Sequence, residues 1–264
     1  MMIDSHVHID SLKYNDEGGV TNILDRAREA GVERVVAPSI HLESFANLLH
    51  IAKEHPLVYP AAGIHPHDAS PSRCQTLARQ LESALAQLDI PIVGETGLEG
   101  HYDFVSMQIQ LESLRPHLEV ARSHDLPVIL HCRQTEEILY EELCKYPGLR
   151  GVVHCFTGTW EWAQRFLDLG FHIGITGIVT FKNSHQVQEV ATKVPADRLL
   201  VETDGPYLAP IPFRGKINKP EYIPLIVEKI AELRGAPAAT VADFTTANTV
   251  ALFGLEKHVG KGSV

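Results

Sequence analysis

Six side chains that can bind a metal ion lie far apart in this sequence, each near the end of a short apolar run. They are His6, His8, Glu95, His131, His154 and Asp204. A structural zinc site usually draws its ligands from one compact stretch of chain. Ligands that are spread from residue 6 to residue 204 must instead be brought together by the fold. The pattern therefore predicts a hydrolytic metal centre rather than a structural one.

The first two ligands belong to the segment MIDSHVHID (2–10), in which apolar and polar residues alternate. A strand there would place His6 and His8 on one face, where both imidazoles can reach one ion. An isolated His-x-His is also found in half-buried strands whose polar residues face solvent. The other four ligands favour the metal site, because they follow or close the runs IPIV, PVIL, GVV and LLV. Catalytic side chains in parallel β/α barrels emerge at the C-terminal ends of such strands.

The elements that must position these ligands alternate between strands and helices along the chain. Apolar runs predict strands at 2–9, 33–38, 57–63, 91–95, 126–131, 151–155, 171–176 and 198–203. Apolar residues at three- and four-residue spacing predict helices at 21–31, 43–55, 74–88, 106–124, 159–170 and 220–235. At 264 residues, the chain has the length of one α/β barrel. We expect a distorted TIM-type (β/α) barrel, forming a single domain over 1–264, with the metal site at the C-terminal end of the strands.

Composition excludes several other classes of protein. The net charge of −10 gives no general basic surface that would grip a polyanion non-specifically. No apolar stretch approaches the roughly 20 residues that span a bilayer, so no membrane association is expected. The four cysteines lack CxxC spacing and the chain starts directly with a strand, which favours a reduced, cytoplasmic protein. No obligate protein partner is evident. Four histidines outside the motifs are expected on the surface, namely His50, His55, His117 and His258.

Seven segments, spread over nearly the whole chain, make this sequence resemble the TatD family of metal-dependent hydrolases. They are DSHVHID (4–10), GIHPH (63–67), GETGLEG (94–100), LPVILHCR (126–133), GVVHCFTG (151–158), GIVTFKN (177–183) and ETDGPYLAPIPFRGKINKPEYI (202–223). The resemblance implies a distorted barrel, a site for one or two metal ions, and hydrolysis of phosphodiester bonds in DNA. It also implies that His6, His8 and Asp204 hold one ion, that His131 and His154 hold a second, and that Glu95 bridges them.

The chain departs from the family pattern after the bridging carboxylate. Glu99 stands where the family usually has an aspartate, and Gly100 replaces the usual aromatic residue. The second change suggests that a stacking surface near the pocket is missing. Both changes leave substrate preference open, whereas the metal ligands are all present.

Two-metal chemistry assigns different catalytic roles to the two carboxylates. Glu95 has two oxygens with which to bridge a pair of ions, and Asp204 is the candidate general base that accepts a proton from the attacking water. A mixed histidine and carboxylate site accepts zinc, manganese, nickel, cobalt or magnesium, so the residues do not choose among these ions. Asp4 or Asp10 is expected to orient a ligating imidazole by accepting its other N–H.

Candidate contacts to substrate phosphate are His65, Arg133 and Lys182, with Arg214, Lys216 and Lys219 in the last long loop. Plain solvation is an equal alternative for Lys216 and Lys219. Tyr207 and Phe213 would either stack on a base or only pin their loop.

Three classes of function follow. The first is a metal-dependent deoxyribonuclease acting on single-stranded DNA or frayed ends. The second is a metal-dependent deacylase that cleaves the ester of an aminoacyl-tRNA. The third, a non-catalytic metal-binding scaffold, is disfavoured because all six ligands are present.

Overall fold

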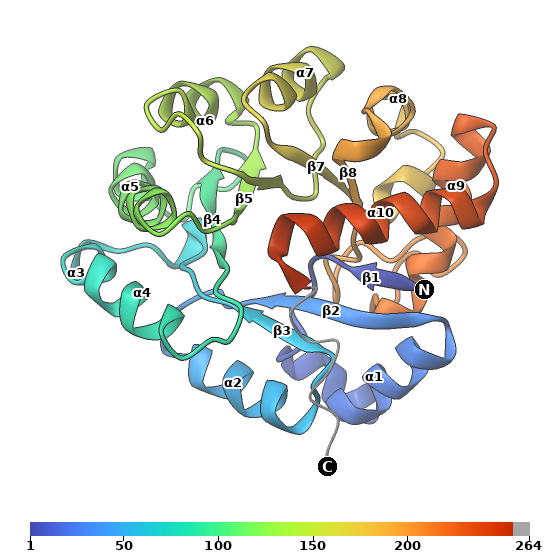
Figure 1. Cartoon of the computed structure of the whole chain (residues 1–264), viewed down its shortest axis with the longest axis horizontal. Helices are drawn as coiled ribbons and strands as arrows, with labels where there is room; N and C mark the ends of the chain where they lie inside the picture. Colours follow the sequence, from blue (N-terminus) through green and yellow to red (C-terminus); the bar gives the residue numbers. More distant parts are fainter. Residues whose placement is uncertain (256–264) are drawn as a thin grey trace.

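The apolar runs form eight parallel strands among residues 1–255, the part of the chain that the computed structural model describes. They are β1 (Met2–Asp4), β2 (Val32–Pro38), β3 (Val58–Ala61), β4 (Val93–Glu99), β5 (Val128–Arg133), β6 (Gly151–Val153), β7 (His172–Ile175) and β8 (Leu199–Val201). Figure 1 shows these strands as an inner ring with helices around the outside. The expected distorted TIM-type barrel is confirmed.

The outer layer consists of helices whose apolar faces pack on the ring. They are α1 (Gly19–Glu29), α2 (Phe45–Glu54), α3 (Pro71–Cys74), α4 (Leu77–Leu85), α5 (Met107–Ser123), α6 (Glu136–Leu143), α7 (Trp160–Asp168), α8 (His185–Lys193), α9 (Ile223–Arg234) and α10 (Ala238–Phe253). Short 3-10 turns are found at η1 (Leu12–Glu17), η2 (Pro66–Asp68), η3 (Gly177–Thr180), η4 (Ala196–Arg198) and η5 (Pro220–Tyr222). No helix within residues 1–255 is long and apolar enough to cross a membrane.

The barrel is distorted because its strands form two separate sheets, one of three strands (β1–β3) and one of five (β4–β8). Single bridges close the two gaps, Ala62 with Val93 and Val7 with Gly205. At the second gap the backbone N–H of Asp204 donates to the carbonyl of His6 over 2.9 Å. The closure of the ring therefore places the first and last candidate ligands side by side.

Helix α10 covers one end of the barrel and lies across the ring in Figure 1. Its Leu252 and Phe253, with Leu255 beyond it, join a buried cluster that also contains residues from six of the strands, namely Ile3, Val36, Tyr59, Ala61, Ile129, Val152 and Leu200. The guanidinium of Arg150, just before β6, donates to the carbonyl of Leu252 over 2.6 Å. Because apolar side chains fill this end, the opposite end, where the strands terminate, is left for polar groups.

Two details differ from the expected elements. Strand β1 ends at Asp4, so His6 and His8 lie beyond it. Both flank Val7, which forms an isolated bridge with Gly205, and their Nε2 atoms lie 3.4 Å apart. The second difference concerns His117, which was expected on the surface but is fully buried within α5. His50 is 69% exposed, as expected, and His258 lies outside the described residues.

Candidate metal centre

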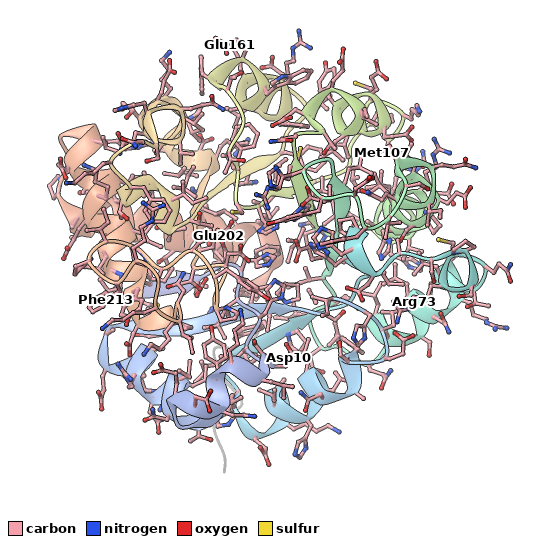
Figure 2. The ribbon with its side chains drawn as sticks, turned by 180° about the vertical axis from the view of Figure 1, so that it is seen from behind. Asp10, Arg73, Met107, Glu161, Glu202 and Phe213 are labelled. Carbon is pink, nitrogen blue, oxygen red and sulfur yellow. The ribbon has the colours of Figure 1, made fainter. Side chains whose placement is uncertain are left out.

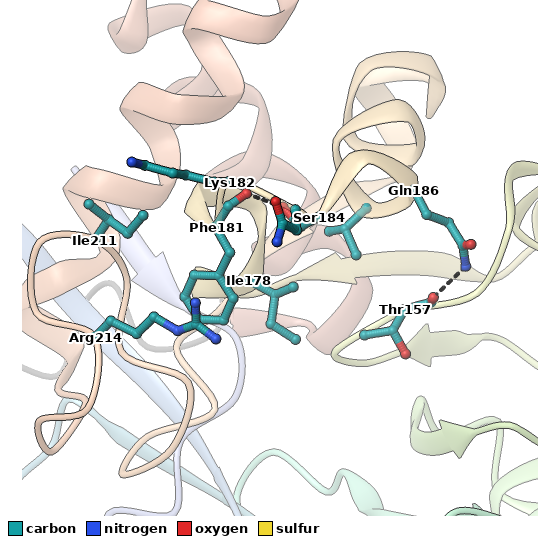
Figure 3. Close-up of a pocket in the computed structure, with 10 residues that line it drawn as sticks. Thr157, Ile178, Phe181, Lys182, Ser184, Gln186, Ile211 and Arg214 are labelled. Atoms are coloured by element: carbon teal, nitrogen blue, oxygen red, sulfur yellow. Dashed lines mark hydrogen bonds between the residues drawn. The ribbon is translucent and has the colours of Figure 1, made fainter.

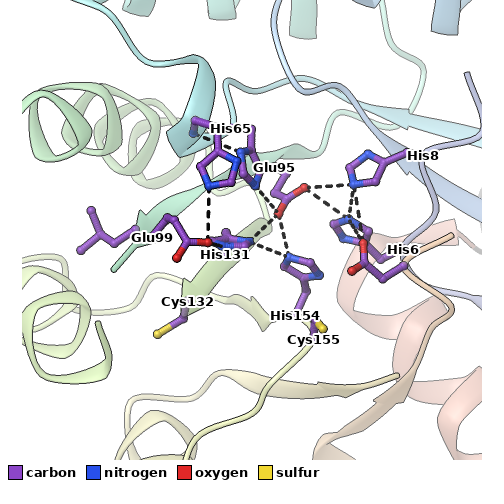
Figure 4. A network of polar contacts seen from close by, with 12 residues as sticks. His6, His8, His65, Glu95, Glu99, His131, Cys132, His154 and Cys155 are labelled. Atoms are coloured by element: carbon purple, nitrogen blue, oxygen red, sulfur yellow. Dashed lines mark hydrogen bonds and ion pairs between the residues drawn. The ribbon is translucent and has the colours of Figure 1, made fainter. Parts of the chain in front are cut away.

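The six candidate ligands meet at the C-terminal end of the strands, around the carboxylate of Glu95 (Figure 4). One oxygen, Oε2, lies 3.3 Å from Nε2 of His6 and 3.5 Å from Nε2 of His8. The carboxylate of Asp204 completes this half, with Oδ1 at 3.6 Å from Nε2 of His8. These groups belong to the segments after β1 and β8 and to the middle of β4.

The other oxygen of Glu95 faces a different pair of imidazoles. Oε1 lies 2.7 Å from Nε2 of His154 and 3.0 Å from Nδ1 of His131. The two imidazole nitrogens are themselves 3.4 Å apart. Glu95 therefore stands between two groups of ligand atoms, each of which converges on one of its oxygens.

The donor set fits divalent metal ions. Glu95 is only 1% exposed, and its Oε2 is buried without a hydrogen bond. A buried carboxylate oxygen that accepts no hydrogen bond needs a cation nearby, because burying an unpaired charge is costly. The nearest groups are imidazole nitrogens, which with carboxylates are ordinary ligands of zinc, manganese, cobalt and nickel. Three clusters of such atoms are close enough for an ion: His6, His8 and Asp204; His6, Glu95 and His154; and His65, Glu95 and His131.

Electrostatics keeps the central carboxylate charged. Burial by itself would raise the pKa of Glu95, but the surrounding imidazoles, with His154 the strongest, hold it well below its usual range. Burial lowers the pKa of His6 and of His8. Burial also acts to lower the pKa of His154, but the charge of Glu95 outweighs it and raises that pKa well above its ordinary value. Glu95 thus has the charge that a bridging ligand requires.

A second buried carboxylate, Glu202, stands behind the site and had no role in the sequence-based assignment. Its Oε1 lies 3.6 Å from Nδ1 of His154 and accepts the backbone N–H of Cys155. Its Oε2 accepts the hydroxyl of Ser5 over 3.0 Å. Figure 2 shows Glu202 near the middle of the molecule. A carboxylate behind a ligating imidazole orients the ring and makes it a stronger ligand.

The sequence did contain a signal for Glu202. It is a charged residue directly after the apolar run LLV, two positions before Asp204. The expectation had instead named Asp4 or Asp10 as the orienting carboxylate. Asp4 accepts hydrogen bonds from the backbone N–H and hydroxyl of Thr203 and from the backbone N–H of His6. It therefore joins the ends of β1 and β8, and no ring nitrogen contacts it among the described residues.

Glu99 orients His131 in a similar way. Its Oε2 lies 3.3 Å from Nε2 of His131, and its Oε1 accepts the backbone N–H groups of His101 and Tyr102. Burial would raise the pKa of Glu99, but these hydrogen bonds lower it to about 2. A charged Glu99 favours a proton on Nε2 of His131, which leaves the lone pair of Nδ1 directed at Glu95 and the candidate ion.

His65 lies closer to the bridging carboxylate than the sequence alone indicated. Its Nε2 is 3.6 Å from Oε1 of Glu95, and its Nδ1 accepts the backbone N–H of His67 over 3.1 Å. Because Nδ1 is an acceptor there, Nε2 carries the proton of the neutral ring. His65 can therefore donate from Nε2 to an oxygen beside Glu95.

Asp204 differs from Glu95 in its access to water. Its side chain is 15% exposed, compared with 1% for Glu95. Burial raises the pKa of Asp204 to about 6, against the opposing charges of His154 and His6. Its backbone is left-handed, with φ of 55°. Of the two carboxylates, Asp204 is the one that an entering water molecule can reach.

The candidate phosphate contacts occupy two sides of this mouth. Arg133, the last residue of β5, has its guanidinium carbon 5.0 Å from the ring centroid of Tyr102. Lys182 lines a groove of about 660 Å³ together with Arg214, whose guanidinium carbon lies 4.3 Å from the ring centroid of Phe181 (Figure 3). The loops after β6, β7 and β8 form this groove, and none of the six metal-ligand candidates lines it.

Two other residues of the last loop have structural roles. Lys219 is 7% exposed and its Nζ lies 2.7 Å from Oε2 of Glu17, so this lysine is not free to meet substrate. Phe213 stacks on Tyr222, with ring centroids 4.4 Å apart, and so pins the loop. Tyr207 is 50% exposed and carries the Nζ of Lys13 4.2 Å from its ring centroid.

Known proteins are similar to this chain in sequence and fold over nearly its whole length. The profile of the family described as TatD related DNase matches residues 3–254. The metal-dependent hydrolase YabD of Bacillus subtilis is 35% identical over 257 residues, which cover 96% of this chain and 99% of that protein. The 3'-5' ssDNA/RNA exonuclease TatD of Escherichia fergusonii is 34% identical, with 96% of this chain and 99% of that protein covered.

A solved structure gives the same result for the fold. The crystal structure of the TatD homologue YjjV from Escherichia coli aligns with a TM-score of 0.86 and 34% sequence identity. The alignment covers 96% of this chain and 98% of that structure. The distorted barrel of this chain is therefore the same fold as that of the TatD homologue.

Proposed function

We propose that this chain, which belongs to the TatD family of metal-dependent hydrolases, hydrolyses phosphodiester bonds of single-stranded DNA with two divalent ions. His6, His8 and Asp204 would hold one ion, and His131 and His154 the other. Zinc, manganese, nickel, cobalt and magnesium all suit this donor set.

The position of Glu95 is the observation that carries the proposal. Its two oxygens lie 3.3 Å and 2.7 Å from imidazole nitrogens of two different pairs. A carboxylate that served one ion would not need a second group of ligands around its other oxygen. Two ions bound there would supply an activated water and neutralise charge on the phosphate oxygens.

The residues around Glu95 would transfer the proton and bind the phosphates. Asp204, the partly exposed carboxylate, would take the proton of the attacking water. The Nε2–H of His65 would donate to a phosphate oxygen beside the ions. Arg133 on one side and Lys182 on the other would hold the neighbouring phosphates of the strand. In support, His65 contacts Glu95, Asp204 contacts His8, Arg133 ends β5, and Lys182 lines a groove between neighbouring loops.

A single strand or a frayed end suits this surface better than a long duplex. The net charge is −10, and the candidate cations lie at the end of β5 and in the loops after β7 and β8. Duplex recognition requires an extended complementary surface. The relative from Escherichia fergusonii is itself named as an exonuclease of single-stranded DNA and RNA.

The test compares a linear single strand of DNA with a covalently closed circle of the same sequence, in the presence of manganese. We expect the linear strand to be shortened from an end and the circle to persist. Equal rates on both would contradict the end preference. If neither is cut and amino acid is instead released from an aminoacyl-tRNA, the protein is a deacylase and the proposal is wrong.

A further inference from the structure

Two aromatic rings lie exposed on the loop that follows β4. Tyr102 is 43% exposed and Phe104 is 68% exposed. The rings stack on each other, with centroids 5.2 Å apart and planes inclined by 5°. Among the exposed large apolar residues within 1–255, these are the two that stack on one another. Folding does not account for them, because neither ring is buried in the core.

Two hydrogen bonds anchor the loop that carries the rings, and a third ring contacts Phe104. Glu99 accepts the backbone N–H of Tyr102 over 3.2 Å, and the amide of Gln110 donates to the carbonyl of Val105 over 2.8 Å. The ring of His67 meets Phe104 edge-on, with centroids 4.9 Å apart. These contacts fix the pair in one orientation, so a ligand would lose little entropy in ordering it.

The pair is also close to the candidate metal centre. Glu99, which holds the loop through Oε1, contacts Nε2 of His131 through Oε2 at 3.3 Å. The Nδ1 of His131 is in turn 3.0 Å from Glu95. One carboxylate and one imidazole thus separate the aromatic pair from the bridging residue.

The pair also lies close in sequence to Gly100, where the family pattern has an aromatic residue. An aromatic side chain does not fit at Gly100, because a Cβ there would lie 2.9 Å from the carbonyl oxygen of Gln134 and 2.9 Å from Cγ2 of Thr135. The aromatic residues are instead two and four positions further along the chain, where both side chains are exposed.

We infer that Tyr102 and Phe104 form a stacking platform for a nucleobase of the single-stranded substrate, next to the phosphate that is cleaved. This inference rests on the proposed function and specifies how the strand is held. A base continues the existing stack of two rings, and stacking accepts any base because each has a π face. Arg133, at 5.0 Å from the Tyr102 ring, is placed to meet the phosphate backbone of the same strand. A protein partner is a poorer fit, since two rings are far smaller than a stable interface.

The experiment compares two oligonucleotides of equal length, oligothymidylate and a strand built only of abasic tetrahydrofuran units. Both have the same phosphates, but only the first has bases. In the wild-type protein with manganese, we expect kcat/KM to be about tenfold to a hundredfold higher for oligothymidylate. In the double variant Tyr102→Ala/Phe104→Ala, the ratio of the two kcat/KM values should fall close to one.

Two variants serve as controls. Ile138→Ala removes another exposed apolar side chain, and Tyr102→Phe keeps both rings, so both should retain the wild-type ratio. A wild-type ratio in the double variant, or equal losses on both strands, would overturn the platform. If the wild-type protein cuts neither strand, the proposed function itself fails, which is a different result from cleavage that does not depend on the rings.

Discussion

Glu95 and Asp204 are two carboxylates in one site, and their surroundings suit the different roles proposed for them. Glu95 is enclosed by imidazoles on both sides, whereas Asp204 retains access to solvent. Enclosure suits a ligand that must stay charged and fixed. Access suits a group that has to exchange protons with an incoming water.

Glu202 is expected to set the strength of the His131 and His154 half of the site. Replacing it as Glu202→Gln keeps the shape but removes the charge behind His154, so metal affinity at this half should fall by about 10- to 100-fold. Titration calorimetry with manganese measures the change. Glu142→Gln is the matched control, because Glu142 on α6 is also buried but pairs with Arg115 on α5. Equal affinities in the two variants would rule out the positioning role.

His117 links three elements in the barrel wall. Its Nε2 accepts the backbone N–H of Ile64 after β3, and its Nδ1 lies 2.7 Å from the carbonyl oxygen of Ser113 and 3.2 Å from the hydroxyl of Thr96 on β4. Burial lowers the pKa of His117 from 6.5 to about 4. The neutral ring is therefore part of the folded structure.

The pH dependence of stability follows from that shift. Above the unfolded pKa of 6.5 the contribution of His117 is complete, and it is lost as the pH falls towards 4, because the unfolded chain takes up the proton first. The loss should reach about 3 kcal/mol at the low end of that range. Urea unfolding with chelator, between pH 7 and pH 4, should show a weaker pH dependence for His117→Gln than for the wild type. His124→Gln, at an exposed position, is the control; an unchanged pH dependence in His117→Gln would contradict the assignment.

At the scale of the elements, β4 is the strand on which the site depends. It carries Glu95 and Glu99 and pairs with β5, where Gly97 lies opposite His131. Gly97 has φ of +146°, and a Cβ at this position would lie 2.0 Å from the carbonyl oxygen of His131. Any side chain there would push β5 and its histidine away.

Gly97→Ala should therefore lower both stability and metal content. Gly148→Ala is the matched control, since Gly148 also has positive φ, of +82°, but has nothing within 4 Å of a Cβ. We expect Gly97→Ala to cost about 2–4 kcal/mol more than the control, from the added steric clash. Urea unfolding gives the difference, and similar free energies of unfolding would show that the close approach to His131 does not matter.

Periodicity predicted most of these elements. All eight strands are found where continuous apolar runs were expected, because strands of a parallel barrel are buried on both faces. The predicted bounds of β1 and β4 were less accurate, because polar candidate ligands interrupt the apolar pattern in both segments and do not show where strand pairing ends. Helices α3, α6, α8 and α10 were not singled out from the sequence, and α10 is the longest of them. Its buried residues include Thr245, Asn248 and Thr249, so it lacks the apolar stripe that identifies an amphipathic helix.

Of the site, the candidate ligands could be picked out from the sequence, whereas the contacts that the supporting carboxylates make could not. His6, Glu95 and His154 have side chains that metals prefer and lie near the ends of apolar runs. Glu202 directly follows an apolar run, but its contact with a histidine 48 positions away, like that of Glu99 with a histidine 32 positions away, is shown by no local pattern. The aromatic pair was missed because Tyr102 and Phe104 lie in a polar loop, where exposure is visible only in three dimensions.

For the whole molecule, the negative net charge predicts an unusual response to salt. Among the candidate phosphate contacts, the cations that lie at the end of β5 or line the groove are Arg133, Lys182 and Arg214, so binding of a single strand should release few counterions. A plot of log affinity against log salt concentration should have a slope of about −2. Lys182→Ala should make the slope shallower by about 0.7, whereas Lys193→Ala, which removes a surface lysine paired with Glu189, should not. A much steeper slope would reveal a basic surface that this account lacks. The single-domain organisation over 1–264 and the cytoplasmic location stay predictions.

In the proposed site, Glu95 bridges two divalent ions that the other five candidate ligands hold. Anomalous scattering from crystals soaked in manganese tests it directly. We expect two peaks about 3.5–4 Å apart, one beside His6, His8 and Asp204 and the other beside His131 and His154, with one oxygen of Glu95 bonded to each. A single peak at saturating manganese, or two peaks that share no contact with Glu95, would contradict it.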